Sequence, residues 1–261
     1  MAPAPLGRAA LLLATLLVGG LLALFGQSHQ TGADLHELFF TWALLALPFA
    51  LAAAWGALWA VWFVVLNVGM ALLCGWLGPD HVVWQVVDGW GRGRATTWLL
   101  PCLVNLLAAG GFNLLRGGRL AAAAPLWLVR LLASVGFVYG TWAAIDATTG
   151  SVNSDSLGGV FGISAGVDAG TATLALWALI VSAIAARTWQ RRRDVFPMAL
   201  VAASAIAVST AWLAHAVRLD GAGSLFLLAL WLIAASTGAG LLLMHWVRAW
   251  RIAPLAEGAA A

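Results

Sequence analysis

The sequence predicts an all-α polytopic bundle of about eight transmembrane helices, which form one integral membrane domain over residues 1–261. The first observation is composition: 63% of the residues are hydrophobic and only 9% are charged, whereas soluble domains carry about 25% charged residues. The second is that the apolar residues form continuous runs without alternation, which favours helices over a barrel. This composition excludes a water-soluble domain, a disordered chain and a disulfide scaffold.

Each apolar run is matched to the bilayer, because crossing a core of roughly 30 Å takes about 20 residues. The first span covers residues 9–25. A long apolar stretch from Leu38 to Leu77 must then fold back on itself, and we place its turn at Ala54-Trp55-Gly56 because glycine tolerates tight backbone angles. This gives spans at 38–54 and 57–77, and the remaining spans are 97–115, 122–145, 171–186, 196–216 and 224–247.

The basic residues orient this bundle. All 13 are arginine, and an N-terminus inside the cell puts nine of them on the inner side, namely Arg8, Arg116, Arg119, Arg187, Arg191, Arg192, Arg193, Arg248 and Arg251. Positive residues favour cytoplasmic loops, so both termini are expected in the cytoplasm, beneath a bacterial inner membrane. The pI of 9.7 then reflects topology and predicts no nucleic-acid partner. Arg191, Arg192 and Arg193 are expected to attract anionic lipid headgroups.

The tryptophans fall near the predicted membrane boundaries. Of 16 in the chain, Trp98 and Trp142 lie at outer ends of spans, and Trp59 and Trp127 at inner ends. Indole rings favour this half-wet zone, so we expect lipid-boundary anchors. An aromatic cleft that binds a sugar or a quinone is the functional alternative.

The first outer loop contains the densest group of candidate functional side chains. Asp34 is expected to cap the helix that follows, and Glu37 three residues later fits a capping box. The functional alternative is a metal or proton site, because imidazole and carboxylate groups suit zinc. The candidate outer-face site comprises Gln27, His29, Asp34, His36 and Glu37, with His81 from the next outer loop. No recognisable catalytic or ligand spacing occurs, so we assign no catalytic residue, metal or cofactor.

The same loop and the span after it resemble a known family. The matching residues are Gly26-Gln27, Gln30 to Asp34, Leu38-Phe39, Trp42 to Pro48 and Leu66-Asn67. They are similar to a bacterial family of predicted multi-pass membrane proteins, domain of unknown function twenty-one fifty-seven. The resemblance covers about the first 75 residues and implies a membrane topology without an activity. The positions that it marks for mutation are Gln27, Gly32, Asp34, Trp42, Pro48 and Asn67.

Two polar residues lie inside predicted spans and are candidates for intramembrane function. Asn67 is expected to hydrogen-bond to another helix, worth about 1 kcal/mol. Arg130 is expected to snorkel to the inner surface, or else to pair with a buried acid or a substrate anion. We expect Asp146 and Asp168 to flank an outer loop without entering the core, and the scarcity of buried acids, with none at mid-membrane, counts against a proton-coupled transporter.

Small residues recur at helical spacing and predict helix packing. Gly158, Gly162, Gly166 and Gly170 are four residues apart, and they form either a packing stripe or a re-entrant turn. Gly136 and Gly140 offer a partner groove in span 122–145, as Ser236 and Gly240 do in span 224–247. Cys74 and Cys102 are expected to be buried thiols, with a disulfide as the alternative.

Three hypotheses for function remain open. The first is a non-enzymatic membrane scaffold, assembly or sensing module that contacts the bilayer and a membrane-protein partner or a second copy of itself. The second is a small-solute transporter with a cavity near Arg130. The third is a membrane-embedded enzyme or metal site at the outer face.

The arginine distribution gives a direct test of topology. Reporter fusions placed within residues 116–119 and 187–195 are expected to report a cytoplasmic location, because both segments are rich in arginine. The measurement is a paired assay with one reporter active only in the cytoplasm and one active only outside it. An outside signal from either fusion contradicts the eight-span arrangement.

Overall fold

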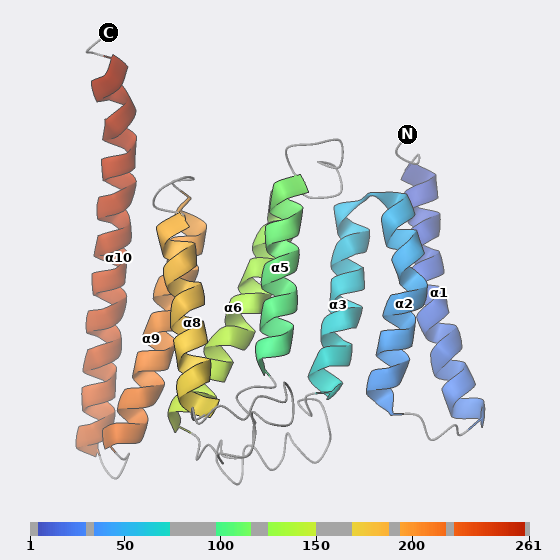
Figure 1. Ribbon diagram of the computed structural model, residues 1–261, viewed down its shortest axis with the longest axis horizontal. Coiled ribbons are helices and arrows are strands. Elements are labelled where there is room, and N and C mark those ends of the chain that lie inside the picture. The colour runs from blue at the N-terminus through green and yellow to red at the C-terminus, as the bar shows by residue number, and fades with distance from the viewer. Residues whose placement is uncertain are drawn as a thin grey trace. The chain divides into compact units, whose positions relative to one another are not determined.

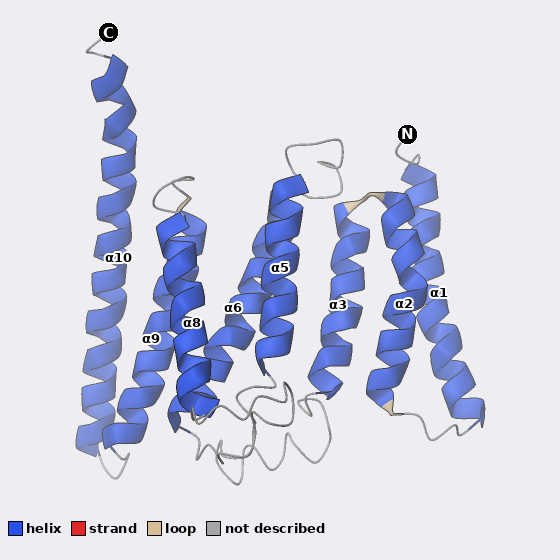
Figure 2. Cartoon of the chain, in the orientation of Figure 1, coloured by secondary structure: helices blue, strands red, loops and turns tan. Residues whose placement is uncertain are grey.

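The chain folds into helices, as the apolar runs require. The computed structural model describes residues 5–29, 34–73, 98–115, 125–149, 169–187, 194–217 and 222–258. Within these ranges all regular structure is helical (Figures 1 and 2). The helices are α1 (Pro5–His29), α2 (Leu35–Ala53), α3 (Gly56–Leu73), α5 (Leu99–Leu115), α6 (Leu126–Thr149), α8 (Ala169–Arg187), α9 (Val195–Val217) and α10 (Ala222–Gly258).

The eight described helices coincide with the eight predicted spans, so the all-α prediction is confirmed. Seven of them are long and apolar enough to cross a membrane, and α5, with 17 residues, is a shorter apolar helix. The chain is therefore a multi-pass membrane protein in contact with a lipid bilayer. The side of the membrane on which the termini lie stays a prediction.

The predicted turn between α2 and α3 is present, but its mechanism differs from the expected one. The residue with left-handed backbone is Ala54, at φ 44° and ψ 42°, and Gly56 is the first residue of α3. A Cβ on Gly56 would lie 2.6 Å from Cδ of Pro125. Glycine is thus needed at position 56 for the close approach of the residue that precedes α6.

Helix boundaries differ from the predicted spans by up to four residues, except that α10 continues 11 residues beyond its predicted end, and both ends of α6 lie four residues later than predicted. The start of α6 follows Pro125, whose carbonyl oxygen accepts hydrogen bonds from the backbone N–H groups of Leu128 and Val129. Its end lies at Thr149, beyond the apolar run. The hydroxyl groups of Thr148 and Thr149 both donate to the carbonyl oxygen of Ile145 in this last turn, at 2.8 and 2.9 Å.

The chain divides into two compact units, and the first comprises residues 1–89 and 103–133. In this unit α2 packs between α1 and α3 (Figure 1). Its buried face consists of Ala43, Ala46, Ala50 and Ala53, at a spacing that brings them to one side of a helix. Because alanine is small, both neighbouring helices approach closely.

Tryptophan side chains hold these three helices together. Trp42 Nε1 donates to the carbonyl oxygen of Thr15 at 2.8 Å, which joins α2 to α1. Trp62 Nε1 donates to the carbonyl oxygen of Ala43 at 2.7 Å, which joins α3 to α2. Trp59 packs edge-to-face on Trp62 and on Phe112, with ring centroids 5.6 and 5.2 Å apart. Trp59 is half-buried and contributes to packing inside the unit, and its place at the lipid boundary stays a prediction.

The second unit comprises residues 90–102 and 134–261. Here α9 packs against both α8 and α10. Trp98 is only 3% exposed, and its ring lies against those of Tyr139 and Trp142 at centroid distances of 6.2 and 6.3 Å. Its expected place in a lipid-boundary belt is corrected, whereas Trp212 on α9 is exposed as such a belt requires.

Two adjacent glycines in α1 provide a matched test of this packing. A Cβ on Gly19 would lie 2.7 Å from Cδ2 of Trp42, a rigid ring held by its hydrogen bond, whereas a Cβ on Gly20 would meet nothing within 4 Å. Gly19→Ala should lower the free energy of unfolding by about 1–3 kcal/mol through overpacking. Gly20→Ala should leave it unchanged or raise it slightly. Unfolding in mixed micelles measures both, and equal effects would contradict the packing of α1 on α2.

Candidate functional site

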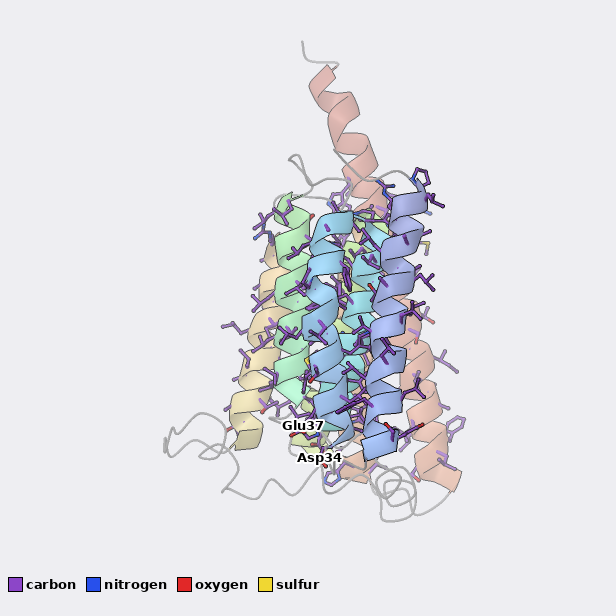
Figure 3. The ribbon with its side chains drawn as sticks, turned by 90° about the vertical axis from the view of Figure 1, so that its right-hand side faces the viewer. Asp34 and Glu37 are labelled. Carbon is purple, nitrogen blue, oxygen red and sulfur yellow. The ribbon has the colours of Figure 1, made fainter. Side chains whose placement is uncertain are left out.

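The predicted outer-face site begins at the first turn of α2. Asp34 is the N-cap residue, with extended backbone at φ −67° and ψ 146°. Its carbonyl oxygen accepts hydrogen bonds from the N–H groups of Glu37 and Leu38, at 3.0 and 3.4 Å. Its side chain makes no capping hydrogen bond, so the capping position is confirmed and side-chain capping by Asp34 is wrong. Figure 3 shows Asp34 and Glu37 together at this end of the helix, where negative charge is favourable.

The other residues of this candidate site divide into described and undescribed ones. His36 is half-buried, and its ring lies edge-on to Phe40 at 6.3 Å. Gln27 is exposed near the end of α1. The side chain of His29 and the whole of His81 lie outside the described residues. Among the described side chains no group of three His, Cys, Asp or Glu residues could hold a metal ion, so a metal site at this face stays a prediction.

Asn67 makes the interhelical hydrogen bond that was expected of it, and its partner is Asn105 of α5. Asn67 Nδ2 donates to Asn105 Oδ1 at 3.1 Å, and Asn105 Nδ2 donates to Asn67 Oδ1 at 2.7 Å. Asn67 Nδ2 also donates to the carbonyl oxygen of Phe63 at 2.8 Å. Because Asn105 is 0% exposed, this reciprocal pair satisfies amide groups that water cannot reach.

Asn105 is a residue that the sequence interpretation missed. A signal was available in the sequence: Asn67 lies ten residues before the end of the predicted span 57–77, and Asn105 lies eight residues after the start of the predicted span 97–115. Consecutive membrane helices run in opposite directions, so similar distances from the connecting segment place two residues at similar depth. Two amides at similar depth in apolar helices predict a pair.

A second polar contact joins three helices of the other unit. The hydroxyl of Ser204 on α9 lies 2.6 Å from that of Thr141 on α6, and it accepts a hydrogen bond from Trp177 Nε1 of α8 at 3.1 Å. Ser204 is buried. One small hydroxyl group thus connects α6, α8 and α9, a role in packing that its position in an apolar run did not indicate.

The structure corrects the expectation that Asp146 lies outside the spans. Asp146 belongs to α6, three residues before its end at Thr149, and its side chain is only 8% exposed. Its Oδ2 atom is buried and has no hydrogen-bond partner among the described residues. The prediction failed because α6 extends past the apolar run, which brings Asp146 into the helix. Asp168 lies outside the described residues.

Arg130 lies four residues after the start of α6 at Leu126 and is half-buried. Helical rise places its Cα about 6 Å from that end of the helix, within reach of the membrane surface for a side chain of this length. Its Nε atom is buried, and snorkelling stays a prediction. A transport cavity at Arg130 stays a hypothesis.

The packing glycines are described only in part. A Cβ on Gly140 would lie 3.0 Å from Sγ of Cys102, whose thiol is free and buried. Gly136 is buried on the same helix, and Gly170 is buried at the start of α8. The other predicted residues of this kind, together with the remaining cysteine and the arginine cluster, lie outside the described residues: Gly158, Gly162, Gly166, Cys74, Arg191, Arg192 and Arg193.

The amide pair predicts a measurable coupling between α3 and α5. Asn67→Ala and Asn105→Ala should each lower the free energy of unfolding, because each leaves the other amide without its partner. The double variant should lose less than the sum of the two, with a coupling energy of about 1 kcal/mol. Unfolding of the four proteins in mixed micelles gives this value. Strictly additive losses would show that the two amides do not support each other.

Comparison with known proteins finds a family match for the N-terminal part of the chain. No curated protein and no solved structure matches the chain. The family resemblance noted in the sequence is confirmed over a shorter segment than expected, and this segment contains α1, α2 and the turn to α3 but not Asn67. Over residues 3–59 the chain matches the family described as predicted membrane protein (DUF2157), which supports a membrane protein of unknown function.

Proposed function

We propose that this chain is a non-enzymatic membrane protein of a bacterial inner membrane. It acts as a scaffold, assembly or sensing module that binds another membrane protein. The observation that carries the proposal is the exposed state of α10. Its span from Gly223 to Trp250 contains no buried residue. In the apolar stretches of α3 and α6, by contrast, about two-fifths of the residues are buried. The face that α10 offers to its surroundings is therefore apolar around nearly the whole helix.

Two glycines of α10 are open, unlike Gly69 of α3 and Gly140 of α6. A Cβ on Gly69 of α3 would lie 3.2 Å from Cβ of Phe39, and Gly140 is similarly covered by Cys102. A Cβ on Gly238 or Gly240 of α10 would meet nothing within 4 Å. Small residues allow close approach of transmembrane helices, so segment 234–240, which contains both glycines, suits a helix from another chain.

The length of α10 supports the same proposal. It has 37 residues against the 23 of α9, the helix on which it packs. At 1.5 Å per residue this is about 55 Å against about 35 Å. The occupant that we propose for segment 234–240 is a transmembrane helix of a partner protein, whose chain can also contact the part of α10 that continues beyond the span.

A small-solute transporter remains the second candidate, and one observation favours it. The sequence argument against coupling to protons was the scarcity of buried acids and the lack of one at mid-membrane. Asp146 is a buried acid near the end of α6, and intramembrane ionisable residues commonly mark ion or substrate pathways. It identifies no solute, and the lack of an acid at mid-membrane still counts against proton coupling.

The assembly proposal is tested by comparing two open glycines on different helices. Full-length wild type, Gly240→Leu and Gly20→Leu are purified from native membrane in mild detergent, and co-purifying proteins are quantified by mass spectrometry. A Cβ added to either glycine would have no atom within 4 Å. We expect a stoichiometric partner with wild type and Gly20→Leu, and a several-fold loss with Gly240→Leu.

Native mass spectrometry of the same samples identifies the occupant. A hetero-complex that Gly240→Leu disrupts supports the proposal. A homodimer that Gly240→Leu disrupts shows that the occupant is a second copy of the chain and not a partner protein. A monomer in all three samples, with no stoichiometric protein, overturns the assembly function.

A further inference from the structure

Asp146 is a buried carboxyl group that the proposed assembly function does not use. We propose that it binds one monovalent cation, a proton or a sodium ion, near one end of α6. The side chain is 8% exposed, and its Oδ2 atom is buried without a hydrogen-bond partner among the described residues. A buried carboxylate without a compensating charge or hydrogen bond is strongly unfavourable. A bound cation supplies that compensation.

The face of α6 that carries Asp146 is well packed and partly aromatic. Tyr139 and Trp142 precede Asp146 by seven and four residues, so the three lie on one side of the helix. Both rings pack on Trp98 of the second unit. Ala143, on the same side, is fully buried. Aromatic faces are favourable neighbours for a cation, and these rings lie on the same side of α6 as Asp146.

The charge of the occupant follows from the small number of acidic groups. Divalent calcium and magnesium ions are bound by several oxygen ligands, usually with more than one carboxylate. Within the described part of the chain, Asp146 belongs to no group of three His, Cys, Asp or Glu residues that could hold a metal. One carboxylate balances one positive charge, which favours a monovalent cation.

Among the residues that the structure describes in the second unit, the other titratable groups near this end do not supply that charge. On the described helices of the second unit they are Cys102, Tyr139 of α6 and His215 of α9. A thiol and a phenol are neutral at physiological pH, and His215 is exposed close to the end of α9. Further ionisable residues lie toward the far ends of α8, α9 and α10, on the side where α6 begins: Arg187, Asp194, His245 and Arg248.

A cation can reach Asp146 without crossing the hydrocarbon core. The residue lies three positions before Thr149, the last residue of α6. A rise of 1.5 Å per residue puts its Cα about 4–5 Å from the helix end. Exchange with the aqueous phase on that side therefore needs only a short path.

Labelling with dicyclohexylcarbodiimide tests the proposal on the full chain in lipid nanodiscs. This apolar reagent adds to a protonated carboxyl group shielded from water and rearranges to a stable N-acylurea, with no atom lost. Peptide mass spectrometry then measures the labelled fraction of Asp146 across a pH series, with sodium chloride or choline chloride. Asp146→Asn should abolish the labelled peptide. Glu37→Gln, which removes an exposed acid at another helix, should leave it unchanged.

The two occupants give different results. If the proton is bound, labelling falls with rising pH, by about tenfold per pH unit above the midpoint, in either salt. If sodium is bound, sodium chloride protects Asp146 at a fixed pH and choline chloride does not. Either result supports a monovalent cation site. No labelling of wild-type Asp146 at any pH, or labelling that neither pH nor sodium changes, overturns the proposal, and both outcomes are measured on the wild-type chain.

Discussion

A bilayer contains no water to satisfy the polar groups of a chain that crosses it, and this constraint shapes every described element. The backbone meets it by forming helices. The side chains meet it across helices: Asn67 with Asn105, and the indole N–H groups of Trp42 and Trp62 with carbonyl oxygens of neighbouring helices. Each such contact fixes the register of one helix against another, so the polar groups that cost most to bury also determine how the first unit packs.

Close approach of the helices depends on small residues opposite large ones. Trp42 packs over Gly19, Phe39 and Phe40 pack over Gly69, and Pro125 packs over Gly56. Without Gly19 the indole of Trp42 could not lie against α1 and reach the carbonyl oxygen of Thr15. The packing of small residues and the hydrogen bonds between helices are thus two parts of one arrangement.

The sequence predicted what depends on local composition. Run length and apolar content located all eight described helices and the turn at Ala54, since both follow from the thickness of the bilayer. Features that depend on pairing between distant segments were harder to predict. The burial of Trp98 depends on rings of α6, and that of Asp146 on where α6 ends. The outer-face hypothesis involves His29 and His81, whose side chains the structure does not describe.

The helices differ in apolar length, and this difference bears on the lipid around them. The 17 residues of α5 span about 25 Å, less than the roughly 30 Å of an average hydrocarbon core. Its exposed Leu100, Leu107 and Leu114 lie seven residues apart, on one lipid-accessible line along the helix. The apolar span of α10 has 28 residues and exceeds the core. A thinner bilayer relieves the mismatch at α5 and increases the tilt that α10 needs, so membrane thickness acts on these two helices in opposite directions.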